Sequence, residues 1–200
     1  MPRKELKYYN PSQNLDHKLV SALARVAEVF KVLLLKAGGK YKLSTLQVEI
    51  MLFLMQHPPT LRTVSQLARE FNISKATMSI ALRSLLAKRL VTKAETPDLR
   101  SFRIYLTPRG FNLATRLLQF RQPILRAIHK MDREKKDTML EQLLQLLYAL
   151  QQAGVISPMR MCLSCAHFAR TSGGMAYCML LQKALEPAAL RIDCPEHRAA

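Results

Sequence analysis

Four cysteines in the last forty residues are the strongest chemical signal in the sequence. Cys162 and Cys165 form a C-x2-C pair, and Cys178 and a Cys194-Pro195 pair follow at wider spacing. The rest of the chain is strongly basic and has no cysteine, so a reducing cytosol fits it better than a disulfide framework does. Four thiolates gathered in this way usually close around one metal centre. The sequence therefore predicts that all four cysteines ligate a metal.

The spacing leaves the identity of this centre open. Zinc ribbons usually carry two C-x2-C pairs, whereas this chain carries one pair and two separate cysteines. The Cys194-Pro195 pair resembles the end of many iron–sulfur ligand runs, which favours an iron–sulfur cluster over zinc. A thiol redox sensor without metal is the third alternative. We also expect a helix from Tyr177 to Leu185, whose N-terminus would favour the thiolate form of Cys178.

Two histidines lie near the cysteines in sequence. His167 and His197 could complete a metal site in principle. A place on the surface, or beside the ligands rather than among them, fits each histidine better.

The chain as a whole carries a large positive charge. The 200 residues include 31 Lys and Arg against 14 Asp and Glu, a formal net charge of +17. Such an excess indicates a polyanionic partner, with nucleic acid favoured over an anionic membrane surface. The first residues lack the apolar core of a signal peptide, and no apolar run is long enough to cross a bilayer. We therefore expect a cytoplasmic protein with no membrane partner.

Apolar periodicity predicts two helices near the start of the chain. Residues 13–37 repeat apolar side chains every three or four positions, and Gly38-Gly39 is expected to end that helix. Ser44 and Gln47 have the spacing of a capping box for a second helix, which Pro58-Pro59 ends. The second helix is apolar nearly all round, so we expect it to be buried.

Two further helices follow in close succession. Thr63 is expected to cap a helix to Phe71, and Ser74 a longer one to about Arg89, with only Asn72-Ile73 between them. Two helices joined by so short a turn form a helix-turn-helix. The exposed face of the second helix would reach base edges in the major groove. Its candidate DNA-binding residues are Lys75, Ala76, Thr77, Ser79 and Arg83.

A β-hairpin is predicted after the helix-turn-helix. Residues 91–95 and 101–106 have strand character, with 96–100 as the turn. Arg103 is expected to face outward and is a further candidate DNA-binding residue. Between Arg62 and Arg116, eleven Lys or Arg residues stand against three acidic ones. About half of the excess charge of the chain therefore lies where the pattern already indicates DNA binding.

Two long helices complete this part of the chain. The first begins at Thr107-Pro108 and runs to about His129 with a kink at Pro123, and the second covers residues 132–152, with Gly154 as its stop. Together with the first helix they expose more apolar surface than a small winged helix can cover. We expect a helical dimerisation layer, with packing inside one chain as the alternative.

The order of these elements and their local motifs resembles the MarR family of bacterial transcriptional regulators. The resemblance covers about residues 13–153 and implies a mostly α-helical winged helix-turn-helix with a small β-hairpin wing and a helical dimerisation layer. Family members are homodimers that bind palindromic operators. The motifs that carry the resemblance are Leu67-Ala68, Ser74 to Ser79, Leu85 to Val91, Asp98 to Ser101 and Leu106 to Gly110.

The wing motif differs from the family pattern at one position. The family has Asp-Arg-Arg, and this chain has Asp98-Leu99-Arg100. The resemblance implies that Arg100 enters the minor groove and that Asp98 braces it. The family also has glycine where Arg89 stands, just before the wing.

These observations predict a three-part chain. A basic arm (1–12) precedes a winged-helix and dimerisation domain (13–154), and a nearly neutral four-cysteine tail (158–200) follows. We expect a sequence-specific DNA-binding regulator, a homodimeric repressor, with metal, iron–sulfur or redox input through the tail.

Three other functions compete with this one. The first is a regulator of the same class that responds to a small phenolic or lipophilic effector, with the tail as a structural zinc site. The second is an architectural DNA binder without a preferred site. The third, a thiol oxidoreductase at Cys162 and Cys165, is disfavoured because the pair lacks a βαβ setting. No paired carboxylates, phosphate loop or nucleophile elbow occurs elsewhere, so the chain is not expected to be an enzyme.

Overall fold

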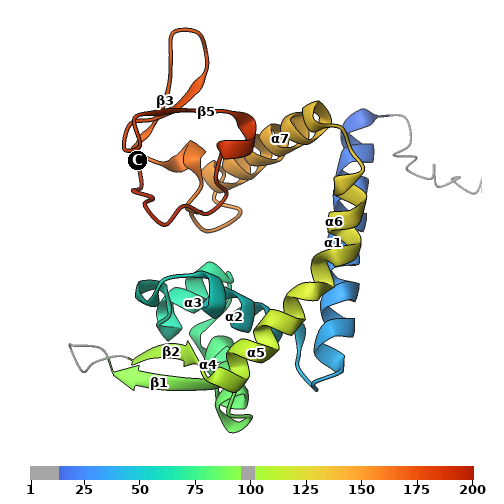
Figure 1. Cartoon of the computed structure of the whole chain (residues 1–200), viewed down its shortest axis with the longest axis vertical. Helices are drawn as coiled ribbons and strands as arrows, with labels where there is room; N and C mark the ends of the chain where they lie inside the picture. The colour runs from blue at the N-terminus through green and yellow to red at the C-terminus, as the bar shows by residue number, and fades with distance from the viewer. Residues whose placement is uncertain (1–13, 96–101) are drawn as a thin grey trace, which may run out of the picture.

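The computed structural model describes residues 14–95 and 102–200. The predicted basic arm and the wing-tip residues Asp98 and Arg100 lie outside the described residues. In Figure 1, a helical lobe with a two-stranded wing occupies the lower part of the molecule, and the cysteine tail lies above it at the end of α7. No helix in the described part of the chain has the length and apolar character needed to cross a membrane.

The first helix has the predicted length but lies two residues further along the chain than its sequence pattern indicates. Helix α1 (Leu15–Gly39) begins at Asn14, whose side chain accepts a hydrogen bond from the backbone N–H of Asp16. The helix continues through both glycines that were expected to end it. Gly38 is required there because a Cβ at this position would lie 2.6 Å from the carbonyl oxygen of Leu43. Close packing, and not helix termination, therefore explains this glycine.

Helix α2 (Thr45–Gln56) forms the centre of the lobe. Its predicted capping box is confirmed: Ser44 accepts from the N–H of Gln47, and the Gln47 side chain accepts from the N–H of Ser44. The helix ends before Pro58, and a short 3-10 turn η2 (Pro59–Leu61) follows. The predicted burial is also confirmed for most of its length. The buried residues are Gln47, Val48, Ile50, Met51, Leu52 and Leu54.

The helix-turn-helix is present as predicted. Helices α3 (Val64–Glu70) and α4 (Lys75–Ala87) are joined by a turn in which Asn72 has a φ of +51°. Thr63 and Ser74 cap them by accepting hydrogen bonds from the N–H groups two or three residues into each helix. Helix α4 is two residues shorter than expected, because the chain reverses at Arg89 with a φ of +55°.

The wing is a two-stranded antiparallel sheet. Strands β1 (Val91–Glu95) and β2 (Phe102–Leu106) pair with Val91 opposite Leu106. Ile104 of β2 is fully buried against the lobe. One apolar core joins the wing to the helices. Its most buried members are Val48, Ile50, Met51, Leu54, Leu67, Met78, Leu85, Ile104, Ala114 and Leu117.

The helix predicted from Thr107 to His129 is interrupted. It consists of α5 (Pro108–Leu117), a 3-10 segment η3 (Leu118–Arg121) and α6 (Gln122–His129). Pro123 has no N–H to donate to the carbonyl of Gln119, so a regular α-helix cannot pass through this point. The predicted helix therefore contains a 3-10 segment just before Pro123, where the sequence predicts a kink.

Helix α7 (Arg133–Gln152) leads from α6 to the tail. It ends before Gly154, whose φ of +70° agrees with its predicted role as a stop. Of the apolar side chains along α7, only Leu144 is buried among the described residues.

The tail is a small irregular domain. It contains η4 (Cys162–Ser164), the antiparallel strands β3 (Phe168–Arg170), β4 (Ala176–Cys178) and β5 (Lys183–Leu185), and η5 (Pro187–Ala189). The segments η4 and η5 contact α7.

The helix predicted at Tyr177–Leu185 is wrong. Cys178 ends strand β4, and the chain then turns back with Gln182 at a φ of +47°. The apolar residues that made this stretch look amphipathic, Met179 to Leu181, are exposed in that turn. Cys178 is therefore placed by strand pairing with Phe168 and Lys183, and not by a helix N-terminus.

Candidate functional site

Helix α4 presents the predicted DNA-binding residues on one face. Lys75, Ala76, Thr77 and Arg83 are exposed, and Ser79 is half-buried. Met78, Leu82 and Leu85 on the opposite face are buried in the core and fix the rotation of the helix. The hydroxyl of Thr77 lies 2.9 Å from that of Ser74, so the start of the helix is held rigidly. The arrangement leaves two long cations, Lys75 and Arg83, and short polar side chains free to meet another molecule.

Arg103 has a different environment from the other candidates. It lies on β2 beside Thr63, and its side chain is half-buried. Its Nε is buried and has no hydrogen-bond partner among the described residues. Arg103 therefore extends from a partly enclosed position on β2.

Arg62 was not predicted, although it links the wing to α2. Its Nε donates to the carbonyl oxygen of His57 at 2.9 Å, and its Nη2 donates to the same oxygen at 2.5 Å. The guanidinium lies over the ring of Tyr105, and the Arg62 carbonyl accepts from the N–H of Ile104 at 2.9 Å. Burial lowers the pKa of Arg62, and the nearby Tyr105 raises it. In the sequence, the only sign of this role was that Arg62 is a single cation directly before the Thr63 cap.

The four cysteines line one small cavity in the tail. The cavity has a volume of about 40 Å³. All four thiols are free and half-buried. The other lining residues are mostly apolar: His167, Phe168, Leu180, Leu181, Leu185, Arg191 and Glu196. The structure thus brings together the residues that spacing alone had grouped.

Hydrogen bonds and burial act on the sulfurs. The backbone N–H of Arg191 donates to Cys162 Sγ at 3.2 Å, and the Arg191 guanidinium donates to Cys194 Sγ at 3.7 Å. Burial raises the pKa of the Cys162 thiol, the Arg191 N–H lowers it, and the three neighbouring cysteines raise it further. The Cys162 thiolate is therefore disfavoured unless a cation balances the charge, as a bound metal does.

The donor set fits a soft metal, although the cysteines are not arranged as a finished single-ion site. Four sulfurs are the donors that zinc and iron–sulfur clusters take. Within residues 14–95 and 102–200, no group of three or more His, Cys, Asp or Glu side chains is placed so that it could hold a metal ion as it stands. The cysteines surround a space instead.

The two histidines near the cysteines differ in position. His197 faces Ser164, with Nε2 at 3.1 Å from its hydroxyl and 3.0 Å from its carbonyl oxygen. His167 lines the cysteine cavity. Only His167 is therefore close enough to the cavity to act as a further ligand or as a hydrogen-bond donor to one.

Comparison with known proteins finds a similar family for part of the chain. Residues 41–100 match the MarR family. This segment spans α2, the helix-turn-helix and β1, which are the elements that carry the candidate DNA-binding face. The matched family is one of transcription regulators, which agrees with the expectation that the chain is not an enzyme.

Solved structures share the MarR fold. The MepR–DNA complex of Staphylococcus aureus has 19% identity and a TM-score of 0.58, and covers 66% of this chain and 97% of MepR. MepR in its DNA-binding conformation has 18% identity and a TM-score of 0.60, and covers 66% and 98%. A MarR family regulator from Silicibacter pomeroyi has 23% identity and a TM-score of 0.56, and covers 70% and 92%. No curated protein matches the sequence.

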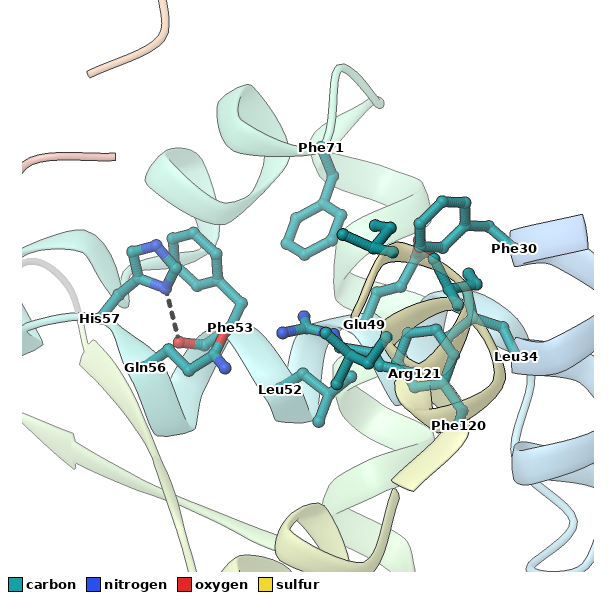
Figure 2. A pocket seen from close by; sticks show the side chains of 13 residues that line it. Phe30, Leu34, Glu49, Leu52, Phe53, Gln56, His57, Phe71, Phe120 and Arg121 are labelled. Carbon is teal, nitrogen blue, oxygen red and sulfur yellow. Dashed lines mark hydrogen bonds between the residues drawn. The ribbon is translucent and has the colours of Figure 1, made fainter. Parts of the chain in front are cut away.

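An open pocket lies between the helices of the MarR-type domain (Figure 2). Its volume is about 630 Å³, and its walls come from α1, α2, η3 and α6. Phe30, Leu34, Leu52, Phe53, Phe71 and Phe120 make the lining largely apolar. Glu49, Gln56, His57 and Arg121 are its polar members.

Glu49 is the part of this pocket that sequence analysis could have found. It is a single carboxylate inside the otherwise apolar run of α2, and burial raises its pKa. The remaining lining residues come together only through the packing of helices far apart in sequence. The MarR-type domain therefore has both an exposed cationic helix face and an apolar pocket with polar groups.

Proposed function

We propose that this protein is a DNA-binding transcriptional regulator of the MarR type, which acts as a homodimeric repressor at a palindromic operator. The observation that carries this proposal is the exposed face of α4, with Lys75, Thr77 and Arg83 beside a wing in a strongly basic domain. Short polar side chains and long cations at the start of a recognition helix suit base edges and phosphates. The similar fold of MepR, which was solved with DNA, supports the same function.

The exposed apolar face of α1 supports the homodimer. Leu19, Val26 and Val29 are among nine large apolar residues of this helix that are more than a third exposed. Leu125 and Ile128 of α6 are exposed as well. Soluble chains rarely leave so continuous an apolar face in water, and a second copy would cover it. A two-fold dimer would present its α4 helices to major grooves about 34 Å apart, which calls for a palindromic site.

We further propose that Cys162, Cys165, Cys178 and Cys194 bind a metal centre that modulates DNA binding. An iron–sulfur cluster is favoured over zinc, because the sulfurs surround a cavity and do not converge as a ready site for one ion. The N–H donors of Arg191 would stabilise thiolates bound to such a centre. When bound, the centre would supply sensitivity to oxidants or to metal supply.

Selection from random duplex DNA tests the DNA-binding proposal. Purified protein should enrich a palindromic site, and the site should be protected in footprinting over two adjacent major grooves on one face. Binding to every duplex with equal affinity would overturn the proposal and would indicate an architectural DNA binder.

Metal and sulfide analysis of protein purified without oxygen tests the second proposal. The expected result is iron and acid-labile sulfide, together with visible absorption that is lost in the Cys162→Ser and Cys178→Ser variants. Zinc without iron would indicate that the tail is a structural zinc site. The absence of both metals from a folded protein would overturn the proposed metal centre. The thiol redox sensor would then be the remaining function.

The apolar pocket supports a second candidate function, a regulator that releases DNA when a small effector binds. A cavity of about 630 Å³ with aromatic walls and a few polar groups suits a small phenolic or lipophilic molecule. Titration of the protein–DNA complex with such compounds tests this function. Release of DNA by a compound, abolished in Phe53→Ala and independent of metal content, would favour it over metal input.

A further inference from the structure

The cysteine tail contacts the DNA-binding lobe through a chain of four charged or titratable side chains. Arg160 Nη1 lies 2.5 Å from Glu70 Oε1, and Arg160 Nε lies 2.7 Å from Asp193 Oδ1. The other carboxylate oxygen of Asp193 contacts Nε2 of His57. These residues, Glu70, Arg160, Asp193 and His57, form what we call the tail–lobe bridge. It joins residues up to 136 positions apart in sequence.

On the lobe side, the bridge ends on two helices and reaches the wing. Glu70 is the last residue of α3, the first helix of the helix-turn-helix. His57 caps the end of α2, with Nδ1 donating to the Phe53 carbonyl oxygen at 2.9 Å and its ring stacked on that of Phe53. The carbonyl of His57 accepts both hydrogen bonds of Arg62, which holds β2. A shift at the bridge would therefore act on α2, α3 and the wing together.

On the tail side, the bridge residues are next to the cavity cysteines. Asp193 directly precedes Cys194, and Arg160 lies two residues before Cys162. The N–H of Cys194 donates to the Arg160 carbonyl at 2.8 Å, and the N–H of Cys162 donates to the Arg191 carbonyl at 3.0 Å. Any group held by both Cys162 and Cys194 fixes these two backbone segments, and with them the two charged groups.

The bridge is partly shielded from water. The side chains of His57, Arg160 and Glu70 are 14%, 18% and 21% exposed, and that of Asp193 is 38% exposed. Salt screens such pairs less than it screens fully exposed ones, and a break leaves charges poorly solvated. Opening of the bridge would therefore leave partly buried charges without their partners.

A second contact reinforces the bridge at the DNA-reading end. Asn72, in the turn between α3 and α4, accepts hydrogen bonds from the N–H of Ser157 at 3.1 Å and from its hydroxyl at 2.5 Å. Ser157 belongs to the short connector between α7 and the tail. The tail thus contacts the helix-turn-helix at two places.

We propose that the tail–lobe bridge transmits the state of the cysteine cavity to the DNA-binding lobe. This inference rests on the proposed function, in which the cavity holds a metal centre and the lobe binds DNA. With the centre in place, Arg160 and Asp193 are held together and fix α2, α3 and the wing relative to α7. When the centre is lost, the two tail segments separate, the bridge opens, and the lobe moves independently of the dimer layer.

The test compares operator affinity with and without the centre. One sample is reconstituted anaerobically with ferrous iron and sulfide, and the other is stripped of iron with a chelator. Wild type should show a ratio of affinities between the two forms of roughly 5- to 150-fold, the usual range of allosteric coupling. Glu70→Gln and Arg160→Gln should bring this ratio to within about twofold of one at unchanged iron content, because the state of the cavity no longer reaches α3.

Glu186→Gln is the matched control. It removes the same charge from an exposed site in the tail, 84% exposed and outside the bridge, and should keep the wild-type ratio. Glu70 is the decisive position because it is far from the cysteines in sequence. Its replacement should therefore not alter the metal centre directly.

Hydrogen exchange gives a readout that needs no DNA. Reconstitution should slow exchange of the α3 amides in wild type and in Glu186→Gln, but not in Glu70→Gln. If Glu70→Gln and Arg160→Gln keep the wild-type affinity ratio and exchange difference, the bridge is not the route. If wild type itself binds operator equally in both forms, the proposed metal input fails, and the inference fails with it.

Discussion

Glu49 illustrates how a single side chain in an apolar setting acquires an unusual protonation equilibrium. Burial against the aromatic walls of the pocket raises its pKa from the ordinary value of 4.5. The folded protein therefore binds this proton more tightly than the unfolded chain does, so the free energy of unfolding falls as the pH rises through the raised pKa. Below about pH 4 both states are protonated, and this cost disappears.

Replacement of Glu49 by Gln should remove that cost. The thermal midpoint of Glu49→Gln should exceed that of wild type at pH 7.5, and the two should converge at pH 4, as measured by circular dichroism melts. Glu186→Gln, at an exposed position, should show no gain at either pH. A Glu49→Gln protein no more stable than wild type at pH 7.5 would show that burial is not what governs this carboxyl.

Arg83 tests the recognition face of α4. Arg83→Ala should weaken binding to the selected operator by about 1–3 kcal/mol and binding to unrelated duplex by less, because an arginine that meets a base edge contributes to discrimination. Fluorescence anisotropy at fixed salt gives both affinities. Lys183→Ala in the exposed part of β5 is the control and should change neither. Equal losses on both duplexes would reduce Arg83 to a phosphate contact.

At the scale of the elements, the starts of helices were predictable because capping is local. Ser44 with Gln47, Thr63 and Ser74 each cap the helix that the sequence assigned to them. A cap needs only side chains and N–H groups within three residues, so no tertiary contact has to be known.

Elements set by tertiary pairing were not predictable. The Tyr177–Leu185 stretch has helix-like apolar spacing, yet it forms β4, a turn and β5 because it pairs with β3. Arg89 adopts a φ of +55° where the related family has glycine, so the reversal before the wing persists without the residue that suits it best. The spacing of residue types in the sequence indicates neither the pairing with β3 nor the reversal at Arg89.

Gly110 tests the close approach of α5 to the wing. A Cβ at this position would lie 1.9 Å from the carbonyl oxygen of Leu90, which is backbone and cannot rotate away. Gly110→Ala should therefore destabilise the fold by about 1–3 kcal/mol or more. Chemical denaturation of the variant and wild type measures this loss.

Gly39→Ala is the opposite control. No atom lies within 4 Å of its Cβ position, and the residue is in the last turn of α1. This variant should be neutral or up to about 1 kcal/mol more stable than wild type. A Gly110→Ala protein as stable as Gly39→Ala would contradict the packing described at α5.

At the scale of the whole molecule, the sequence predicted which side chains come together in the tail better than it predicted how the tail and the lobe are connected. Four cysteines in one short segment had to meet, and they do line one cavity. The pocket and the tail–lobe bridge depend on residues such as His57 and Asp193, 136 positions apart. Such contacts follow from the packing of complete elements and leave no local pattern.

The apolar face of α1 yields a prediction about assembly. Val26 is 51% exposed in the single chain, so an acidic side chain there costs little within one protomer. In a dimer covered along α1, Val26→Glu would bury a charge. The dissociation constant of the dimer should therefore rise at least about tenfold. Sedimentation velocity over a concentration series measures this. Ile80→Glu, exposed on α4, should leave the dimer intact. A monomeric wild type would contradict the proposed dimer.

The most direct test of the whole account is the affinity of one selected operator for the protein with and without its metal centre. The measurement uses anaerobically reconstituted and iron-stripped wild type at the same salt concentration, with an unrelated duplex in parallel. The account predicts specific binding whose affinity differs between the two forms by roughly fivefold or more, with equal and weak binding to the unrelated duplex. Identical operator affinities for the two forms would contradict control by the tail, and identical affinities for both duplexes would contradict sequence-specific DNA recognition.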